Sequence, residues 1–386
     1  MLEPRPQRQP SPEIRYDADL TAVTRSARAA VLLATFLLLA GCATAPTSVL
    51  FSSAPQPTGS NATASPSSTS ASDTALPPTP TPTPIAEPTT FTLTTFPVPP
   101  GSHPHDVAPA ADGGVWYTAQ GSGELGWLDP ATGAVREIAL GSGSAPHGVI
   151  VGPDNAAWVT DSGLNAIVRV DPETDAVTTF PLPRGGANLN TGAFDGDGIL
   201  WFTGQAGVYG WLDPASGNLE VFDAPSGRGP YGIATTPAGD VYYSSLAGSY
   251  LGAINRATGA VNAISTPTKG GGGRRVWSDS SGMLWVTEWY AGKLARYDPV
   301  NDEWREWALP GDSPQPYAVY VDEFDAVWIT DFGANAVHRF DATSEVYVTL
   351  EHESTPANVR QLLGRPGEVW GAESAADQLV VVRWAP

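Results

Sequence analysis

The sequence has almost no cysteine and no apolar segment long enough to cross a membrane. Cys42 is the only cysteine among 386 residues, so no intrachain disulfide can form. The apolar run from Ala29 to Ala40 has twelve residues and would span about 18 Å as a helix. That length is well short of the roughly 30 Å hydrocarbon core of a bilayer. A permanent transmembrane helix is therefore not expected.

Basic residues are also scarce. Twenty Lys and Arg stand against forty Asp and Glu, which gives a formal net charge of −20 at pH 7. A surface of this sign repels a phosphate backbone, so no nucleic-acid partner is expected. A local acidic cluster could instead attract a divalent cation or a cationic ligand.

Residues 1–41 have the pattern of an export signal. Arg25 and Arg28 precede the apolar run, which ends in Leu39-Ala40-Gly41-Cys42. This ending resembles the lipobox of bacterial lipoproteins, in which the cysteine becomes the lipidated first residue of the mature chain. We therefore predict an N-terminal extension with a lipoprotein signal peptide and lipidation of Cys42. The expected location is the cell envelope, anchored by lipid on the extracytoplasmic side.

Residues 42–90 consist largely of Ser, Thr, Pro and Ala. A segment of this composition cannot bury apolar surface, and its Pro-rich end favours extended geometry. We predict a disordered tether, so that the lipid is the only contact with the membrane.

A repeat of about 42 residues fills the rest of the chain, residues 91–386. Its most regular element is an aromatic residue in the phrase small–aromatic–x–Thr, as in Leu284-Trp285-Val286-Thr287. The seven aromatic anchors, spaced by 41 to 43 residues, are Trp116, Trp158, Trp201, Tyr242, Trp285, Trp328 and Trp370. Turn sequences such as Asp129-Pro130-Ala131-Thr132-Gly133 separate short strand-like runs within each unit. The pattern predicts an all-β, seven-bladed β-propeller of four-stranded blades.

The seventh unit contains only three strand-like runs. The missing outer strand has a candidate in Thr94-Thr95-Phe96-Pro97-Val98-Pro99, which nearly copies Thr178-Thr179-Phe180-Pro181-Leu182-Pro183 in the second unit. We therefore expect an N-terminal strand to close the last blade and to cover its exposed edge.

The repeat resembles the virginiamycin B lyase (streptogramin lyase) family. The likeness rests on Leu284-Trp285-Val286-Thr287-Glu288-Trp289, on strand starts such as Pro146-His147-Gly148-Val149 and on endings such as Phe180-Pro181-Leu182-Pro183. It implies a seven-bladed propeller and an elimination that opens the ester of a cyclic antibiotic with Mg²⁺ and a His/Glu set. The family's Glu-Pro-His-Gly motif of the final blade is incomplete here, because that blade reads Pro356-Ala357-Asn358-Val359-Arg360.

Two positions of the repeat are candidates for the mouth of the central channel, since they vary in chemical type while the fold-defining positions recur. The position eleven residues before the anchor holds His105, His147, Asn190, Tyr231, Arg274, Tyr317 and Val359. The position three residues after the anchor holds Ala119, Asp161, Gly204, Ser245, Glu288, Asp331 and Glu373.

We predict His105 and His147 as catalytic residues, because neutral imidazole acts as a general base near pH 7. Carboxylates are hard oxygen ligands for Mg²⁺ or Ca²⁺, and the predicted metal ligands are Asp161, Glu288, Asp331 and Glu373. The predicted ligand-binding residues are His103, Asn190, Tyr231, Arg274 and Tyr317. The alternatives are histidines hydrogen-bonded between blades and carboxylates that cap turns. His338 and His352 fall outside both positions and are expected at the surface.

Two functions remain open on these grounds. The first is a metal-dependent lyase that opens a small cyclic ester or peptide in the channel mouth. The second is a non-catalytic propeller that binds an envelope ligand or partner. In both cases a monomer is expected.

Overall fold

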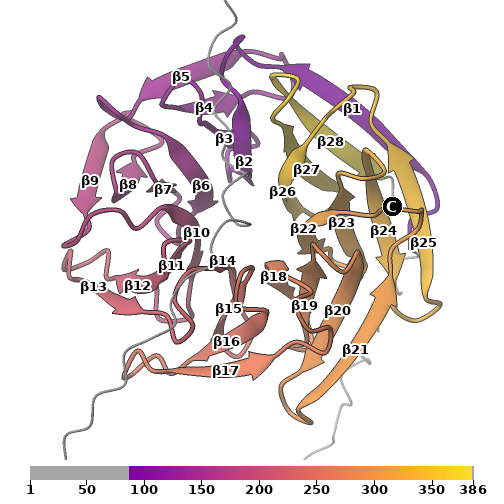
Figure 1. Cartoon of the computed structure of the whole chain (residues 1–386). Helices are drawn as coiled ribbons and strands as arrows, with labels where there is room; N and C mark the ends of the chain where they lie inside the picture. Colours follow the sequence, from indigo (N-terminus) through magenta and orange to yellow (C-terminus); the bar gives the residue numbers. More distant parts are fainter. Residues whose placement is uncertain (1–86, 385–386) are drawn as a thin grey trace, which may run out of the picture. The chain divides into compact units, whose positions relative to one another are not determined.

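A computed structural model describes residues 87–384 of the protein. These residues form 28 β-strands and no helix. The strands make seven four-stranded antiparallel sheets, which lie as blades around a common axis (Figure 1). The predicted seven-bladed β-propeller is confirmed. No helix within residues 87–384 is long and apolar enough to span a membrane.

In the first six blades the strands run from the axis outwards in chain order, and in the seventh β1 is added as the outermost strand. The first two blades consist of β2 (Pro104–Pro109), β3 (Val115–Ala119), β4 (Glu124–Leu128), β5 (Val135–Ala139), β6 (Pro146–Val151), β7 (Ala157–Asp161), β8 (Ala166–Val170) and β9 (Val177–Pro181). The third and fourth consist of β10 (Leu189–Phe194), β11 (Leu200–Gly204), β12 (Val208–Leu212), β13 (Leu219–Asp223), β14 (Pro230–Thr235), β15 (Val241–Ser245), β16 (Tyr250–Ile254) and β17 (Val261–Ser265). The fifth and sixth consist of β18 (Gly273–Ser278), β19 (Leu284–Glu288), β20 (Lys293–Asp298), β21 (Glu303–Ala308), β22 (Pro316–Val321), β23 (Val327–Asp331), β24 (Ala336–Asp341) and β25 (Val346–Glu351). The seventh consists of β26 (Val359–Arg365), β27 (Glu368–Glu373), β28 (Gln378–Trp384) and β1 (Phe91–Pro97).

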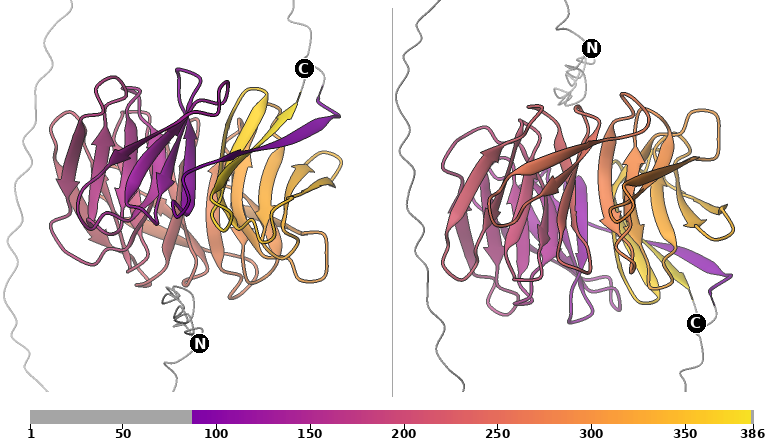
Figure 2. Two further views of the ribbon diagram at one scale, coloured as in Figure 1. Left: turned by 90° about the horizontal axis from the view of Figure 1, so that it is seen from above. Right: turned by 90° about the horizontal axis from the view of Figure 1, so that it is seen from below.

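Strand β1 closes the ring as predicted. It pairs antiparallel with β28 over its whole length, from Phe91 opposite Trp384 to Pro97 opposite Gln378. Figure 2 shows β1, in indigo, lying alongside the yellow strands of the seventh blade. The first and last strands of the ring therefore share one sheet, and β28 has no unpaired edge.

The aromatic anchors fill the space between blades. Trp116 of the first blade lies in one apolar cluster with Val149, Val159 and Val168 of the second. The six tryptophan anchors are each at most 2% exposed. Several of their indole N–H groups donate to an Asp of the preceding turn, as from Trp285 to Asp279 at 2.9 Å. The buried polar atom of such an anchor is thus satisfied, which explains why Asp recurs in that turn.

Each inner strand contains a register shift close to its start. In the first blade Pro104 lies opposite Ala119 and Val107 lies opposite Tyr117, so two residues of β2 face the single residue Thr118 of β3. A β-bulge of this kind bends the strand and changes the direction of its side chains. The same irregularity occurs in all seven blades.

In several blades the threonine two residues after the anchor connects its own bulge to the next blade. Thr118 Oγ1 accepts a hydrogen bond from the Asp106 N–H at 2.9 Å and donates one to the His147 carbonyl, also at 2.9 Å. Thr160 and Thr287 make the same two contacts in their blades. This hydroxyl explains the Thr of the repeat phrase, since it holds adjacent inner strands at a fixed separation.

The predicted signal peptide, the lipidation site Cys42 and most of the predicted tether lie outside the described residues. They stay predictions.

Deleting residues 91–97 should open the ring. Phe91, Leu93 and Phe96 are half-buried against the seventh blade or its neighbours, and losing them costs about 3 kcal/mol in apolar burial alone. We expect a lower melting temperature and concentration-dependent association through the free edge of β28. Thermal unfolding and size-exclusion chromatography measure both. Deletion of residues 62–68 is the control of equal length, and equal stability of the two variants would contradict closure by β1.

Thr287→Val should destabilise the fold although it preserves shape. The Arg275 N–H and the Tyr317 carbonyl would lose their partner, which costs about 1–3 kcal/mol. Thr178→Val on the exposed face of β9 is the matched control and should change stability by less than about 0.5 kcal/mol. Urea unfolding compares them, and indistinguishable midpoints would show that the hydroxyl contributes nothing.

Candidate functional site

The bulges place one side chain of every blade around the axis. In six blades these residues are the ones predicted from the repeat, and each of the six is buried. In the seventh blade Val359 pairs with Glu373 in the way that Pro104 pairs with Ala119, so Arg360 is the counterpart of His105. The prediction of Val359 is corrected to Arg360. The hairpin from Val359 to Glu373 is one residue shorter than the hairpin from Pro104 to Ala119, so counting back from the anchor overshoots by one.

His105 and His147 lie against each other as neighbours in this ring. Their ring centroids are 3.8 Å apart with the planes tilted by 45°. His105 Nδ1 contacts Asp106 Oδ1 at 2.8 Å, and His147 Nδ1 contacts the Asn190 carbonyl at 3.1 Å. Burial lowers the pKa of both imidazoles well below its usual value, and the Arg360 and Arg275 guanidiniums lower it further. Both rings are therefore neutral at physiological pH.

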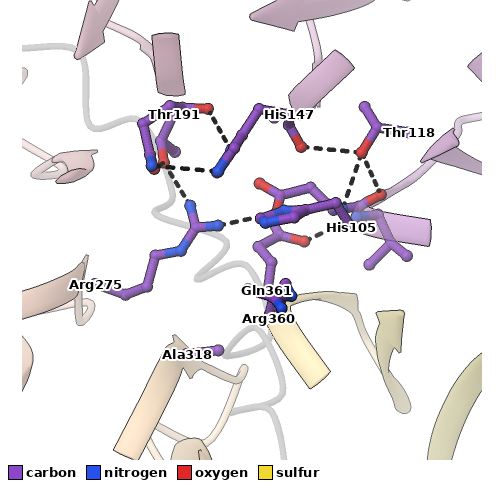
Figure 3. A network of polar contacts seen from close by, with 12 residues as sticks. His105, Thr118, His147, Thr191, Arg275, Ala318, Arg360 and Gln361 are labelled. Atoms are coloured by element: carbon purple, nitrogen blue, oxygen red, sulfur yellow. Dashed lines mark hydrogen bonds and ion pairs between the residues drawn. The ribbon is translucent and has the colours of Figure 1, made fainter. Parts of the chain in front are cut away.

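Arg275 connects this pair to the third blade across the axis. Its Nη2 donates to Asp106 Oδ1 at 2.8 Å, and its Nη1 donates to Thr191 Oγ1. Figure 3 shows the guanidinium reaching from β18 toward Thr191 on one side and His105 on the other. Burial raises the pKa of Asp106, although the guanidinium opposes this shift. The contact is a buried ion pair, with 5% and 1% of the two side chains exposed.

The opposite side of the ring combines arginine with aromatic side chains. The Arg274 guanidinium lies 3.7 Å from the centroid of Tyr317 and 4.3 Å from that of Trp289. Its Nη2 donates to the Tyr231 hydroxyl at 3.1 Å, and that hydroxyl is hydrogen-bonded to Tyr317. Phe332 stacks on Tyr317 with centroids 4.9 Å apart. The predicted ligand-binding residues Tyr231, Arg274 and Tyr317 thus form one cluster.

Two of the predicted carboxylates, Asp161 and Asp331, cap the loops of their own blades. Asp161 accepts hydrogen bonds from the Ala145, Gly163 and Leu164 N–H groups and from the Ser144 hydroxyl. Asp331 accepts from the Gln315 and Gly333 N–H groups. Both carboxylates are satisfied by the protein, which matches the turn-capping alternative.

The other two carboxylates point to partners in the outer strands or in loops. Glu288 lies near Glu306, and burial together with that second carboxylate raises the pKa of Glu288 to about 8. Glu373 contacts His352 Nδ1 at 2.9 Å and also accepts from Gln378. Among residues 87–384, the group with metal-ligand geometry is instead His105, Asp106 and His147, whose ligand atoms lie within 4.8 Å of one another.

Three histidines lie in other places than expected from the sequence. His338 and His352 are buried, 1% and 8% exposed, and contact Asp331 and Glu373, so their expected surface position is wrong. The side chain of His103 is 64% exposed. Its backbone is left-handed at φ 41°, and its N–H donates to Asp377 Oδ1. His103 thus lies in the loop before β2, outside the buried ring.

A cavity of about 240 Å³ lies along the axis beyond the polar ring. Its walls are mostly apolar side chains of the inner strands, such as Val149, Ile233 and Leu363, and Thr191 and Gln361 border it. The ion pair of Arg275 and Asp106, which contacts Thr191, lies between this cavity and the mouth at which the inner strands begin.

Comparison with known proteins identifies the family. The model of the virginiamycin B lyase family matches residues 83–302, more than half of the chain. The chain belongs to this family. No curated protein sequence matches the chain.

Solved structures of this family share its fold. A streptogramin B lyase is 23% identical with a TM-score of 0.71, covering 76% of this chain and 98% of that one. A virginiamycin B lyase from Staphylococcus aureus is 18% identical with a TM-score of 0.72, covering 77% and 100%. YCF48 bound to D1 peptide is 15% identical with a TM-score of 0.60, covering 78% and 99%.

Within this virginiamycin B lyase-family propeller, sequence reasoning missed four residues of the axis: Asp106, Arg275, Arg360 and Gln361. Asp106 and Arg275 each follow a predicted residue directly, and the bulge turns both members of the doublet inward. A strand with strict alternation would have pointed the second member away. The signal was the doublet Arg274-Arg275 itself, since two adjacent charges are unusual at the start of a buried strand.

The neutral histidine pair predicts acid sensitivity. Below pH 6.5 the unfolded chain binds protons on both imidazoles while the folded chain does not, so stability falls as the pH falls. His105→Gln combined with His147→Gln should flatten the stability–pH slope between pH 6.5 and 5.5 by at most roughly 2.7 kcal/mol per pH unit. Urea unfolding across this range measures the slope. His103→Gln is the exposed control. If the double variant keeps the same stability–pH slope as the wild type, the two histidines are not buried in the neutral form.

Proposed function

We propose that the protein is a ligand-binding propeller whose site is the axial mouth where the inner strands begin. One observation carries the proposal: the Arg275 guanidinium is bonded to Asp106, at the position where a divalent cation would need the carboxylate. A protein cation is thus already paired with the carboxylate of the group that has metal-ligand geometry within residues 87–384.

The donor set at the axis does not suit Mg²⁺ or Ca²⁺. Both ions prefer several oxygen ligands, whereas His105, His147 and Asp106 offer two nitrogens and one shared carboxylate. Arg274, Arg275 and Arg360 add positive charge around them. We propose that Asp161, Glu288, Asp331 and Glu373 stay in their own loops and outer-strand contacts and hold no metal together.

A binding role agrees with the variety of proteins that share this architecture. YCF48, with a TM-score of 0.60, is described as bound to a peptide. The comparable fold therefore supports ligand recognition as well as catalysis, and the side chains at the axis decide between the two.

Ring-opening catalysis on a small cyclic ester or peptide is the second candidate. The observation in its favour is the pair of neutral imidazoles at the axis, since His147 or His105 could accept a proton. Asp106 Oδ2, buried and without a hydrogen-bond partner among residues 87–384, would be the oxygen left for a metal of borderline softness.

We further propose that lipidation of Cys42 tethers the monomer to the extracytoplasmic face of the membrane. The support is the basic pair and apolar run before Leu39-Ala40-Gly41-Cys42 and the Ser/Thr/Pro-rich segment after it.

Incubation with virginiamycin B distinguishes the two candidates. We expect no ring opening above the protein-free rate by chromatography, and a melting temperature that Mg²⁺ and EDTA leave unchanged, because Arg275 already neutralises Asp106. The control is His147→Ala under the same conditions. Ring opening by the wild type that EDTA and His147→Ala both abolish would establish the lyase and reject the binding proposal.

A further inference from the structure

The axial mouth holds more positive than negative charge. Arg274, Arg275 and Arg360 contribute three guanidiniums, and the only carboxylate bonded to any of them within residues 87–384 is Asp106, on Arg275. The charges that act on Arg274 and Arg360 come from tyrosines and other arginines rather than from carboxylates. Two buried or half-buried cations therefore have no carboxylate counter-ion within residues 87–384, an arrangement that is costly unless a partner is supplied.

The surroundings of Arg274 leave part of the guanidinium group without hydrogen bonds. The residue is 6% exposed, and its Nε has no hydrogen-bond partner among residues 87–384. The faces of Tyr317, Trp289 and Tyr231 surround it at 3.7, 4.3 and 4.9 Å. Aromatic faces attract a cation, but they accept none of its N–H bonds in the guanidinium plane.

Arg360 lies on the solvent side of the same cluster. It is half-buried, its guanidinium is 5.8 Å from the Tyr317 ring and 5.9 Å from the Phe332 ring, and its Nε donates to Ser374 Oγ at 3.1 Å. Its guanidinium is also hydrogen-bonded to Tyr317, and no carboxylate within residues 87–384 is paired with it. A ligand entering from solvent would meet Arg360 before Arg274.

We propose that this site binds an organic carboxylate, held by Arg360 and Arg274, with its apolar or aromatic part against Trp289 and Phe332. The inference rests on the proposed binding function and specifies its ligand class. A guanidinium presents paired N–H donors that match the two oxygens of a carboxylate. The half-buried rings of Trp289 and Phe332, which contact each other edge-to-face at 5.4 Å, supply an apolar wall beside those donors. The bound carboxylate would supply the negative charge that Arg274 and Arg360 do not receive from a protein carboxylate.

The phenolate form of Tyr317 would compete with a bound carboxylate for the guanidinium groups. Burial would raise the pKa of its hydroxyl, but the guanidiniums of Arg274, Arg360 and Arg275 outweigh burial and lower it to about 8. The charged and titratable groups that face it are these three arginines and Tyr231, whose own pKa rises to about 12 because it is buried. Tyr317 is thus mostly neutral at pH 7 and leaves the cations free, whereas above pH 8 its phenolate would occupy them.

Calorimetric titration of the full chain with benzoate at pH 7 tests the proposal, with benzamide, acetate and inorganic phosphate as comparison probes. Benzoate should bind, and neutral benzamide should bind at least about tenfold more weakly. Arg360→Gln should weaken benzoate at least tenfold. Arg305→Gln, which removes an exposed guanidinium paired with Glu345 on an outer strand, is the matched control and should not change it. Equal binding of benzamide, or binding of phosphate without benzoate, would overturn the assignment.

The pH profile provides a second readout that does not depend on an arginine variant. Benzoate affinity should fall above pH 8, by up to about tenfold per pH unit, because the Tyr317 phenolate then competes with the ligand. Tyr317→Phe should remove that fall. A phenolate absorbance already present at pH 7 that benzoate leaves unchanged would mean that Tyr317 is the counter-ion, and the proposal would be wrong. Such a failure leaves a neutral ligand possible, whereas metal-dependent ring opening would reject the binding function itself.

Discussion

The hydroxyl two residues after the aromatic anchor is the contact on which the arrangement of the axis depends, and it belongs to a threonine in five blades and to Ser244 in the fourth. It accepts from the bulged inner strand of its own blade and donates to the carbonyl of the axial residue in the next blade, as Thr118 does for Asp106 and His147. One small polar group thus sets both the bulge and the spacing between blades. The seventh blade has Ala372 at this position, and there Gln361 Oε1 accepts the Val107 N–H across the closure at 2.9 Å. The ring therefore remains hydrogen-bonded where the repeat changes.

Because the scaffold holds each axial side chain in a fixed place, its chemistry is set by residue type alone. This propeller places neutral histidines on one side of the axis and arginines with aromatic residues on the other. The Arg275–Asp106 ion pair connects the two sides. The local charge is opposite in sign to the net charge of −20 for the whole chain. The field at the mouth thus differs from that of the surface, and the composition of the whole chain does not reveal the charge of the site.

Fold and closure were predictable because they depend on local, repeated features. Anchor spacing, turn residues and the copied Thr-Thr-Phe-Pro strand are all visible in the chain, and β1 pairs with β28 as those features indicate. The six axial positions counted from the anchors were predicted as candidates for the channel mouth, and the structure places their side chains in one buried ring. The count missed Arg360 because it assumes one loop length, and it placed His338 and His352 at the surface because it contains no information on outer strands.

The sequence by itself determined the number of blades, their order and the strand that closes them, since each follows from burial and turn chemistry within about 42 residues. Only the tertiary structure decided which side chains meet. Arg275 and Asp106 are 169 residues apart and on non-adjacent blades. Their contact depends on the curvature of the ring, on bulges that turn two successive residues inward, and on the length of individual hairpins. None of these is encoded in the spacing of the repeat. The spacing fixes the position of a residue along its blade, but it does not fix the direction in which the side chain crosses the axis.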